Sequence, residues 1–251
     1  MDTVGRPNLR EIRFQRNKVS NWGNYPFSIP VIKNLKDIKF DRKVTFFVGE
    51  NGSGKSTLLE AIADNYGFGK EGGSRNISFQ TSEEASAVEL GEYLKLSWEQ
   101  KILGGYFFRA ESFFNVASYI DEIQKIDGKA YAAYGGMSLH KRSHGESFLS
   151  LFENRLSRGG FFLLDEPEAA LSPLRQLSLM IILHNILKNK NTQFIIATHS
   201  PILLAFPNAQ ILSFDEEKIK EVTYKETKPF QIVSTFINNP ETYFKRLFDE
   251  N

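Results

Sequence analysis

The sequence contains no cysteine among its 251 residues. This absence excludes disulfide bonds, thiolate zinc sites and cysteine nucleophiles, and it is compatible with a reducing compartment. Long hydrophobic runs are absent too: the longest, such as 161–164 and 179–183, fall far short of the roughly 20 apolar residues of a membrane-spanning helix. The N-terminus also lacks the apolar stretch of a signal peptide. We therefore expect a cytoplasmic protein with no integral membrane segment of its own.

Charge of one sign is not in large excess, because the formal net charge is only +1. Its distribution is uneven, since residues 1–43 contain ten Lys or Arg and four Asp or Glu. Such a basic segment is either one edge of a nucleic-acid surface or an ordinary solvated face. With 41% hydrophobic and 24% charged residues the composition is that of a globular chain, and the length favours a single large α/β domain.

Residues 49–57, Gly-Glu-Asn-Gly-Ser-Gly-Lys-Ser-Thr, match the phosphate-loop pattern G-x-x-x-x-G-K-[ST] at every position. In this pattern backbone N–H groups surround the phosphates, Lys55 reaches the β and γ oxygens, and the Ser56 hydroxyl holds Mg²⁺. The flanks agree, because the apolar run 44–48 predicts a strand before the loop and 56–65 predicts a helix after it. The predicted phosphate-binding residues are Asn51, Gly52, Ser53, Gly54, Lys55, Ser56 and Thr57.

Two carboxylates follow a second apolar run, at 161–164. Ligands bind at the carboxyl ends of parallel strands, so this placement brings Asp165 to the nucleotide. We expect Asp165 to orient Mg²⁺ through water and Glu166 to act as the base that polarises the attacking water. His199 follows a third apolar strand, predicted at 193–197, where its ring can hydrogen-bond a terminal phosphate.

Residues 143–147, Ser-His-Gly-Glu-Ser, open a predicted helix over 145–156. The start of a helix offers free N–H groups, and here also a hydroxyl, to an anion. The same residues describe an ordinary helix cap, because Ser-x-x-Glu is the capping-box pattern. Taken alone, the segment leaves both interpretations open.

The alternation of strands and helices predicts a mainly parallel sheet. Further strands are predicted at 9–15, 77–80, 94–98 and 101–108, and further helices at 111–126, 174–187 and 240–248. Residues 210–214 and 219–224 suit a hairpin that turns at 215–217, and 131–136 is predicted to be a loop.

These motifs, in this order, resemble the ABC-type ATPase superfamily of P-loop NTPases over essentially the whole chain. The resemblance implies an α/β fold in which helices flank a mainly parallel sheet, with an N-terminal antiparallel β part and a helical signature subdomain. It implies one ATPase domain over 1–251, with a core lobe of 1–80 and 159–251 and a helical lobe of about 81–158. ATP and Mg²⁺ are the implied ligands. The implied catalytic residues are Lys55, Glu166 and His199, with Ser56 and Asp165 at the metal.

Residues 142–146 lie where this family has its signature, Leu-Ser-Gly-Gly-Gln or Leu-Ser-Gly-Gly-Glu. Three of the five positions match, whereas Arg142 and His144 depart from the pattern. The imidazole of His144 either adds a γ-phosphate contact, tunes turnover or is an accommodated variant. The residues that the resemblance predicts to contact the ATP of a second copy are Ser143, His144, Gly145 and Glu146.

The family's D-loop corresponds to 170–172, and His199 resembles its switch histidine. One family residue has no counterpart, because the glutamine that contacts Mg²⁺ and water is absent after the strand at 101–108, where Arg-Ala-Glu stands. Three interpretations of this segment stay open. Glu111 faces the metal in place of the glutamine, Arg109 faces a phosphate, or Glu111 only stands near the start of a helix.

The adenine needs a flat partner, and Tyr25 is the first candidate. It lies in an aromatic loop about 30 residues before Lys55, with Trp22 and Phe27 behind it. The alternative is that these rings cover an edge of the core.

The resemblance implies Mg²⁺-dependent ATP hydrolysis by a head-to-tail homodimer that closes around two ATPs. The chain resembles compact stand-alone members of the SMC-related and AAA-like branch, which implies a role in genome maintenance or phage defence with a nucleic acid or an effector protein as partner. Two alternatives stay open: the nucleotide-binding subunit of an ABC transporter, and an ATP sensor without turnover that controls an effector.

Overall fold

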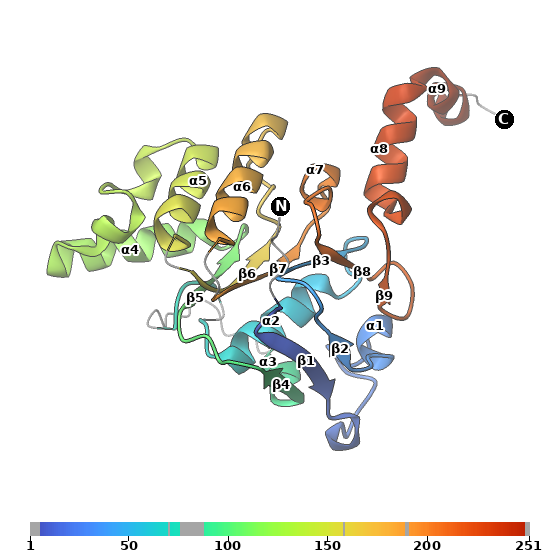
Figure 1. Ribbon diagram of the computed structural model, residues 1–251, viewed down its shortest axis with the longest axis horizontal. Helices are drawn as coiled ribbons and strands as arrows, with labels where there is room; N and C mark the ends of the chain where they lie inside the picture. The colour runs from blue at the N-terminus through green and yellow to red at the C-terminus, as the bar shows by residue number, and fades with distance from the viewer. Residues whose placement is uncertain (1–5, 70, 76–87, 158, 189–190, 249–251) are drawn as a thin grey trace.

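The computed structural model describes residues 6–69, 71–75, 88–157, 159–188 and 191–248. Its centre is a six-stranded sheet in the order β5-β6-β7-β3-β8-β9 (Figure 1). All neighbouring strands in it are parallel except β8 and β9, which form an antiparallel hairpin. The predicted mainly parallel sheet is therefore confirmed. Its strands are Gly105–Arg109 (β5), Gly160–Asp165 (β6), Thr192–Ala197 (β7), Val44–Val48 (β3), Gln210–Ser213 (β8) and Lys220–Glu221 (β9).

A smaller sheet, in the order β2-β1-β4, forms the N-terminal part of the fold, and both of its pairings are antiparallel. Ile12 of β1 pairs with Ile38 of β2 on one side and with Leu96 of β4 on the other. The N-terminal antiparallel part that the resemblance implies is therefore present. The strands span Leu9–Phe14 (β1), Ile38–Lys39 (β2) and Leu94–Trp98 (β4).

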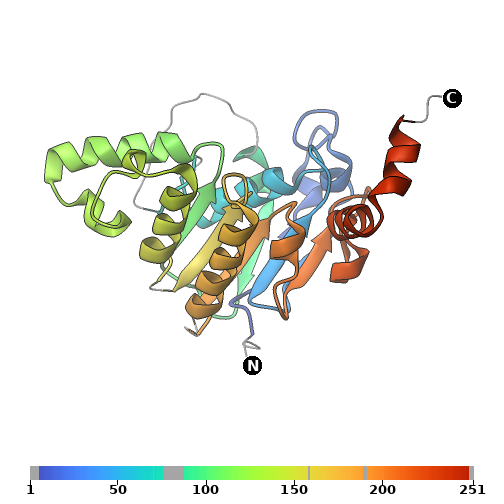
Figure 2. The same ribbon diagram turned by 90° about the horizontal axis from the view of Figure 1, so that it is seen from above.

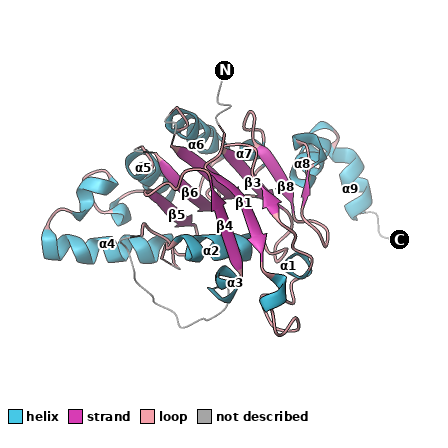
Figure 3. Cartoon of the chain, turned by 60° about the horizontal axis from the view of Figure 1, so that its bottom comes forward, coloured by secondary structure: helices cyan, strands magenta, loops and turns pink. Residues whose placement is uncertain are grey.

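Helices cover both faces of the central sheet (Figure 3). Helix α2, Lys55–Tyr66, lies between the two sheets, whereas α5, α6 and α7 cover the opposite face of the larger one. The alternation of side chains along β3 explains these layers, because Phe46 packs with the core under α5 and α6 while its neighbour Phe47 packs with α2. The remaining α-helices are Pro30–Lys33 (α1), Val88–Glu92 (α3), Phe113–Asp127 (α4), His144–Arg155 (α5), Pro173–Ile186 (α6), Pro201–Leu204 (α7), Lys228–Asn238 (α8) and Pro240–Phe248 (α9).

Two helical parts project from this body at opposite ends (Figure 2). At one end α4 reaches outward and returns to α5 through two short 3₁₀ helices, Ala130–Tyr134 and Leu139–Lys141. At the other end α8 and α9 stand clear of the sheet. Among the described residues, no helix is long and apolar enough to cross a membrane.

Several predicted elements differ from those in the structure. The strand predicted at 101–108 begins only at Gly105, and before it the Ile102 carbonyl accepts a hydrogen bond from the Tyr66 hydroxyl. The predicted loop at 131–136 is a 3₁₀ helix over most of its length, and the second hairpin strand is confined to β9. Helices α7 and α8 were not predicted, and the strand predicted at 77–80 lies outside the described residues.

Candidate nucleotide-binding site

The phosphate loop joins the buried strand β3 to the first turn of α2. Gly52 and Gly54 have φ angles of +76° and +99°, in the left-handed region that other residues rarely adopt. Helix α2 begins directly at Lys55, so the N–H groups of its first turn are directed toward the loop. A loop with this backbone at a helix N-terminus is suited to bind an anion.

The Lys55 side chain lies inside the loop. Its ammonium donates hydrogen bonds to the carbonyl oxygens of Gly49 (2.7 Å) and Glu50 (3.0 Å). Burial lowers the pKa of Lys55, and the nearby carboxylates of Glu166 and Asp165 oppose that shift. Within the described part of the chain, the Lys55 ammonium has no hydrogen bond to a carboxylate. A phosphate oxygen bound in the loop can therefore replace the loop carbonyls as its acceptor.

Ser56 and Asp165, both predicted to lie at the metal, are in direct contact. The Ser56 hydroxyl donates a hydrogen bond of 2.9 Å to Asp165 Oδ1, which joins α2 to the end of β6. Burial raises the pKa of Asp165 to about 7, although the Ser56 hydrogen bond and the Arg109 charge act in the opposite direction. Two oxygen donors at this separation, in a site short of protein ligands, fit Mg²⁺, which takes few protein oxygens and completes its shell with phosphates and water.

Arg109, and not Glu111, is the residue beside Asp165. Arg109 ends β5 and is the register partner of Asp165 in β6. Its guanidinium makes an ion pair of 2.7 Å with Glu60 of α2 and a second one with Glu111. The Glu111 side chain is 73% exposed and bound to Arg109, so the structure gives its predicted metal-facing role no support. The residue that directly ends β5 is thus held in ion pairs with Glu60 and Glu111.

Glu166 and His199 meet at the ends of β6 and β7. Glu166 has a φ of +50°, an uncommon conformation for a residue with a side chain, and its N–H donates to the Ala197 carbonyl at 3.0 Å. This backbone leaves the carboxylate half exposed, with Oε1 3.6 Å from His199 Nε2. The two residues predicted to act on the water and on the terminal phosphate are therefore neighbours.

Glu168 fixes the position of His199, a role that the sequence did not reveal. One carboxylate oxygen accepts hydrogen bonds from the Thr198 hydroxyl (2.6 Å) and from the His199 N–H (2.7 Å). Burial raises the pKa of Glu168. The signal in the sequence is a third carboxylate three residues after Asp165, but only the fold shows that it crosses to the next strand.

Among the buried polar atoms without a hydrogen-bond partner in the described residues, two can face a phosphate. They are Ser53 Oγ in the phosphate loop and His199 Nε2. Buried polar groups are nearly always paired, so an unpaired one points to a missing ligand. A phosphate oxygen is an acceptor for both.

The predicted signature residues form a separate cluster at the start of α5. Ser143 is the N-cap of α5. The Ser143 N–H (3.0 Å) and the Ser143 hydroxyl (2.6 Å) both donate hydrogen bonds to Glu146 Oε2. The capping-box interpretation is thus confirmed. Arg175 of α6 adds a hydrogen bond to Ser143 Oγ (3.3 Å) and an ion pair with Glu146 (3.6 Å). In the described part of the chain these side chains bind each other and not the phosphate loop.

Gly145 and His144 have different environments. A Cβ atom on Gly145 would lie 2.4 Å from Arg175 Nη1 and 3.0 Å from the Ala170 carbonyl, so a side chain here would displace the Arg175 guanidinium and press on the D-loop region. The exposed ring of His144 packs edge-on against Phe114, with 4.6 Å between the ring centroids. The position where the family has glycine therefore accommodates the imidazole on the outside of the helix.

Of the three candidate aromatic residues, Tyr25 makes a contact with the end of the phosphate loop. Its hydroxyl is 3.2 Å from Thr57 Oγ1, and the residue is 49% exposed. Phe27 is only 4% exposed, and Trp22 packs against it at 6.3 Å. Those two rings cover the core, which leaves Tyr25 as the ring available to a base.

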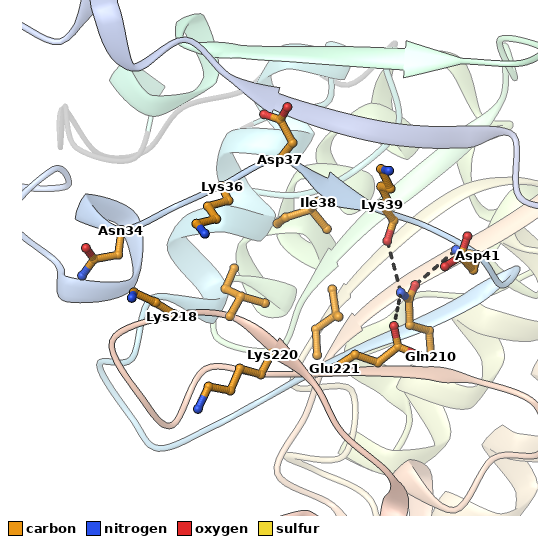
Figure 4. Close-up of a pocket in the computed structure, with 12 residues that line it drawn as sticks. Asn34, Lys36, Asp37, Ile38, Lys39, Asp41, Gln210, Lys218, Lys220 and Glu221 are labelled. Carbon is orange, nitrogen blue, oxygen red and sulfur yellow. Dashed lines mark hydrogen bonds between the residues drawn. The ribbon is translucent and has the colours of Figure 1, made fainter.

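A second cavity, of about 440 Å³, opens between β2 and the β8–β9 hairpin (Figure 4). These are the neighbouring edges of the two sheets, and Gln210 bridges them by donating to the Lys39 carbonyl at 3.1 Å. Figure 4 shows the amino groups of Lys36, Lys218 and Lys220 toward one end of this cavity. Part of the basic N-terminal segment thus lines this cavity, together with the carboxylates of Asp37, Asp41 and Glu221.

Comparisons with known proteins identify a family and a fold for this chain. Residues 18–231 match a protein family described as an AAA domain. The tungstate uptake system ATP-binding protein TupC of Campylobacter jejuni is 27% identical over 221 residues, which are 78% of this chain and 63% of that protein. The arabinose import ATP-binding protein AraG of Mannheimia succiniciproducens is 28% identical over 165 residues, which are 59% of this chain and 33% of that protein. The chain therefore spans less than two thirds of the length of these relatives.

A solved structure is similar over nearly the whole chain. CbiO1 from Clostridium perfringens, part of the ABC transporter complex cbiONQ, superimposes with a TM-score of 0.50 at 18% identity, covering 94% of this chain and 97% of that one. At this identity the likeness shows the fold.

Proposed function

We propose that this chain binds ATP and hydrolyses it to ADP and phosphate. The chain belongs to the AAA domain family and has the fold of an ABC-type P-loop NTPase. The observation that carries the proposal is the 2.9 Å contact between Ser56 and Asp165 beside the buried Lys55. A phosphate loop alone serves many nucleotide-binding proteins, whereas this contact adds the acidic strand end that hydrolysis needs.

Each residue has a defined part in the proposed reaction. Lys55 and the loop N–H groups hold the phosphates, and Ser56 and Asp165 would hold Mg²⁺, which neutralises charge on the β and γ phosphates when bound. Glu166 orients the attacking water and accepts its proton, since its carboxylate is half exposed at the end of β6. His199 donates from Nε2 to the γ-phosphate, while Glu168 fixes its backbone.

The proposed active form is a head-to-tail homodimer with one ATP between the phosphate loop of one copy and the signature residues of the other. Its support is the separate cluster at the start of α5, where Ser143 is exposed and helix N–H groups are available to an anion. Opposing helix N-termini from two chains can enclose one γ-phosphate from two directions. ATP then stabilises the closed dimer, and hydrolysis releases it.

We further propose that residues 1–251 form one such ATPase domain, with a core lobe of 1–80 and 159–251 and a helical lobe of about 81–158. We also propose that the protein acts in the cytoplasm, because its proposed substrate is ATP.

The proposed biological partner is nucleic acid, in genome maintenance or phage defence. The lysines at one end of the second cavity support it, because cationic side chains on one edge of a protein attract the phosphate backbone. The names of the relatives, TupC and AraG among them, favour a second candidate, the ATP-binding subunit of a transporter. Stimulation of the ATPase by DNA or RNA would favour the first candidate. Co-purification with a membrane protein would favour the second.

The direct test is the release of phosphate from ATP and Mg²⁺ by the purified chain, compared with a Glu166→Gln variant. Release that stops in the variant while ATP binding persists supports an ATPase. Dimerisation with ATP but no release from either protein supports an ATP sensor instead.

A further inference from the structure

The C-terminal arm, α8 with α9, exposes an unusual amount of apolar surface. No residue of α8 is buried, and Ile237 is 70% exposed. Contiguous apolar surface of this kind on a soluble protein marks an interaction site. The large apolar residues exposed on the arm are Ile232, Val233, Phe236, Ile237, Phe244, Leu247 and Phe248.

A second exposed apolar stripe lies on α6. Leu174, Leu177 and Ile181 are all exposed, the first of them by 73%, and their spacing of three and four residues places them on one face. The other face of α6 is buried in the core through Leu179 and Leu183. A helix that is apolar on both faces is normally buried on both, so the outer stripe lacks a cover.

Within one chain these two surfaces do not meet. In Figure 1 and in Figure 2 the arm stands apart from α6, with α7 between them. The arm therefore does not cover the α6 stripe of its own chain, although the two surfaces have the same chemistry.

The arm begins at the phosphate loop. Lys228, the first residue of α8, makes ion pairs with Asp215 (3.3 Å) and with Glu50 of the loop (3.9 Å). Asp215 also accepts a hydrogen bond from the Glu50 N–H at 3.2 Å. The base of the arm is thus tied to the half of the site that holds the phosphates.

Helix α6 begins at the other half of the site. Arg175, in its first turn, binds both Ser143 and Glu146 of the signature cluster. The α6 stripe starts at the neighbouring residue, Leu174. A contact that joins the phosphate loop of one copy to Ser143 of the other therefore also brings the base of one arm toward the α6 of the other copy.

We propose that in the dimer the arm of each copy packs on the Leu174–Leu177–Ile181 stripe of the second copy. This inference rests on the proposed head-to-tail dimer and adds an apolar contact outside its two ATP sites. The symmetry of a dimer makes the contact reciprocal, since each chain gives an arm and receives one. Each arm then buries apolar side chains that are exposed in the monomer, which stabilises the closed state.

The absence of cysteine permits a clean cross-linking test. Two singly substituted chains of different tag length, Ile237→Cys and Ile181→Cys, are mixed in the Glu166→Gln background with ATP and Mg²⁺ and treated with a short bismaleimide. We expect a cross-linked species of intermediate size that requires ATP. The matched control replaces Ile181→Cys by Leu103→Cys, which is 77% exposed in another part of the surface and gives no such product.

Each other outcome overturns the inference in a distinct way. If the Glu166→Gln parent stays monomeric with ATP by light scattering, the proposed dimer fails and the arm contact with it. If the parent dimerises but only Ile237→Cys chains cross-link to each other, the two arms pack on one another and not on α6. If the parent dimerises and no pair cross-links, a different partner covers the arm.

A second measurement does not depend on cross-linking geometry. The double variant Ile232→Ser with Ile237→Ser is expected to bind ATP as the parent does, but to need at least about tenfold more protein for ATP-dependent dimerisation, as removal of two buried aliphatic side chains implies. Unchanged dimerisation in this variant contradicts the proposal.

Discussion

The Ser56 hydroxyl donates a 2.9 Å hydrogen bond to Asp165, 109 positions away in the sequence. It joins the first turn of α2 to the end of β6, two strands away from β3 in the central sheet. The phosphate-binding half and the hydrolytic half of the site are therefore assembled in one chain. Only the signature cluster, around Ser143, stands apart.

Removing the lysine of the loop should weaken nucleotide binding strongly. Lys55→Ala deletes the one ammonium that lies inside the loop, so we expect the affinity for ATP to fall by at least about tenfold, as loss of a charge-assisted hydrogen bond implies. Titration with a fluorescent ATP analogue measures the change. Lys125→Ala, an exposed lysine on α4, is the control, and equal affinities in the two variants would refute the assigned role.

Removing the general base should separate binding from turnover. We expect Glu166→Gln to slow phosphate release by about 100-fold or more, in the range of general-base effects, while ATP binding is kept. Size-exclusion chromatography should then show a dimer that persists as long as ATP is present. Hydrolysis at the wild-type rate in this variant would assign the base to another residue.

The Arg109–Glu60 pair should matter more than a surface pair. Its side chains are only 15% and 22% exposed, so Arg109→Leu leaves a carboxylate largely buried and unpaired, and we expect a loss of about 3 kcal/mol in the free energy of unfolding. Urea unfolding at neutral pH measures it. Arg10→Leu, which breaks the more exposed pair with Glu99, is expected to cost under about 1 kcal/mol. Equal losses would show that the Arg109 pair has no special structural part.

Glu168 should make stability depend on pH. Burial raises its pKa above the ordinary value of 4.5, so the folded chain retains a proton that the unfolded chain releases, and stability falls as the pH rises through the folded pKa. We expect Glu168→Gln to flatten this decline, since Oε1 of the amide can still accept from Thr198 and His199. Melting temperatures between pH 4.5 and pH 8 measure the effect. Glu153→Gln, exposed on α5, should leave the curve unchanged, and a decline that persists undiminished in Glu168→Gln would contradict this cause.

The lysines of the second cavity should bind nucleic acid if that partner is correct. We expect the double variant Lys36→Glu with Lys218→Glu to weaken binding of single- or double-stranded DNA and to reduce the slope of affinity against salt by about two, one for each phosphate that is no longer neutralised. Fluorescence anisotropy at several salt concentrations measures it. The exposed pair Lys125→Glu with Lys129→Glu is the control, and identical slopes would remove the pocket from any nucleic-acid surface.

The local parts of the site could be predicted from the sequence. Phosphate-loop glycines and a strand ending at Asp165 are contiguous patterns whose geometry follows from short-range rules. Contacts between strands could not be predicted in this way. The link from Glu168 to His199 and the placement of Arg109 beside Asp165 depend on strand order and register, which no single segment encodes.

The arm shows a different limit. Residues 228–238 have apolar side chains at helical spacing, yet they were not predicted to form a helix. The apolar face of this helix lies on the surface of the monomer and not in its core. Sequence patterns are interpreted most securely where one chain buries its own apolar face.

The measurement that tests the central claim most directly is complementation between two variants. Ser143→Arg disables the signature cluster, and Glu166→Gln disables the base, while both retain their phosphate loops. In a head-to-tail dimer that combines one copy of each, one of the two sites has an intact loop, base and signature, so the mixture should hydrolyse ATP well above either variant alone. A mixture no more active than the average of its two components would show that ATP is not shared between copies.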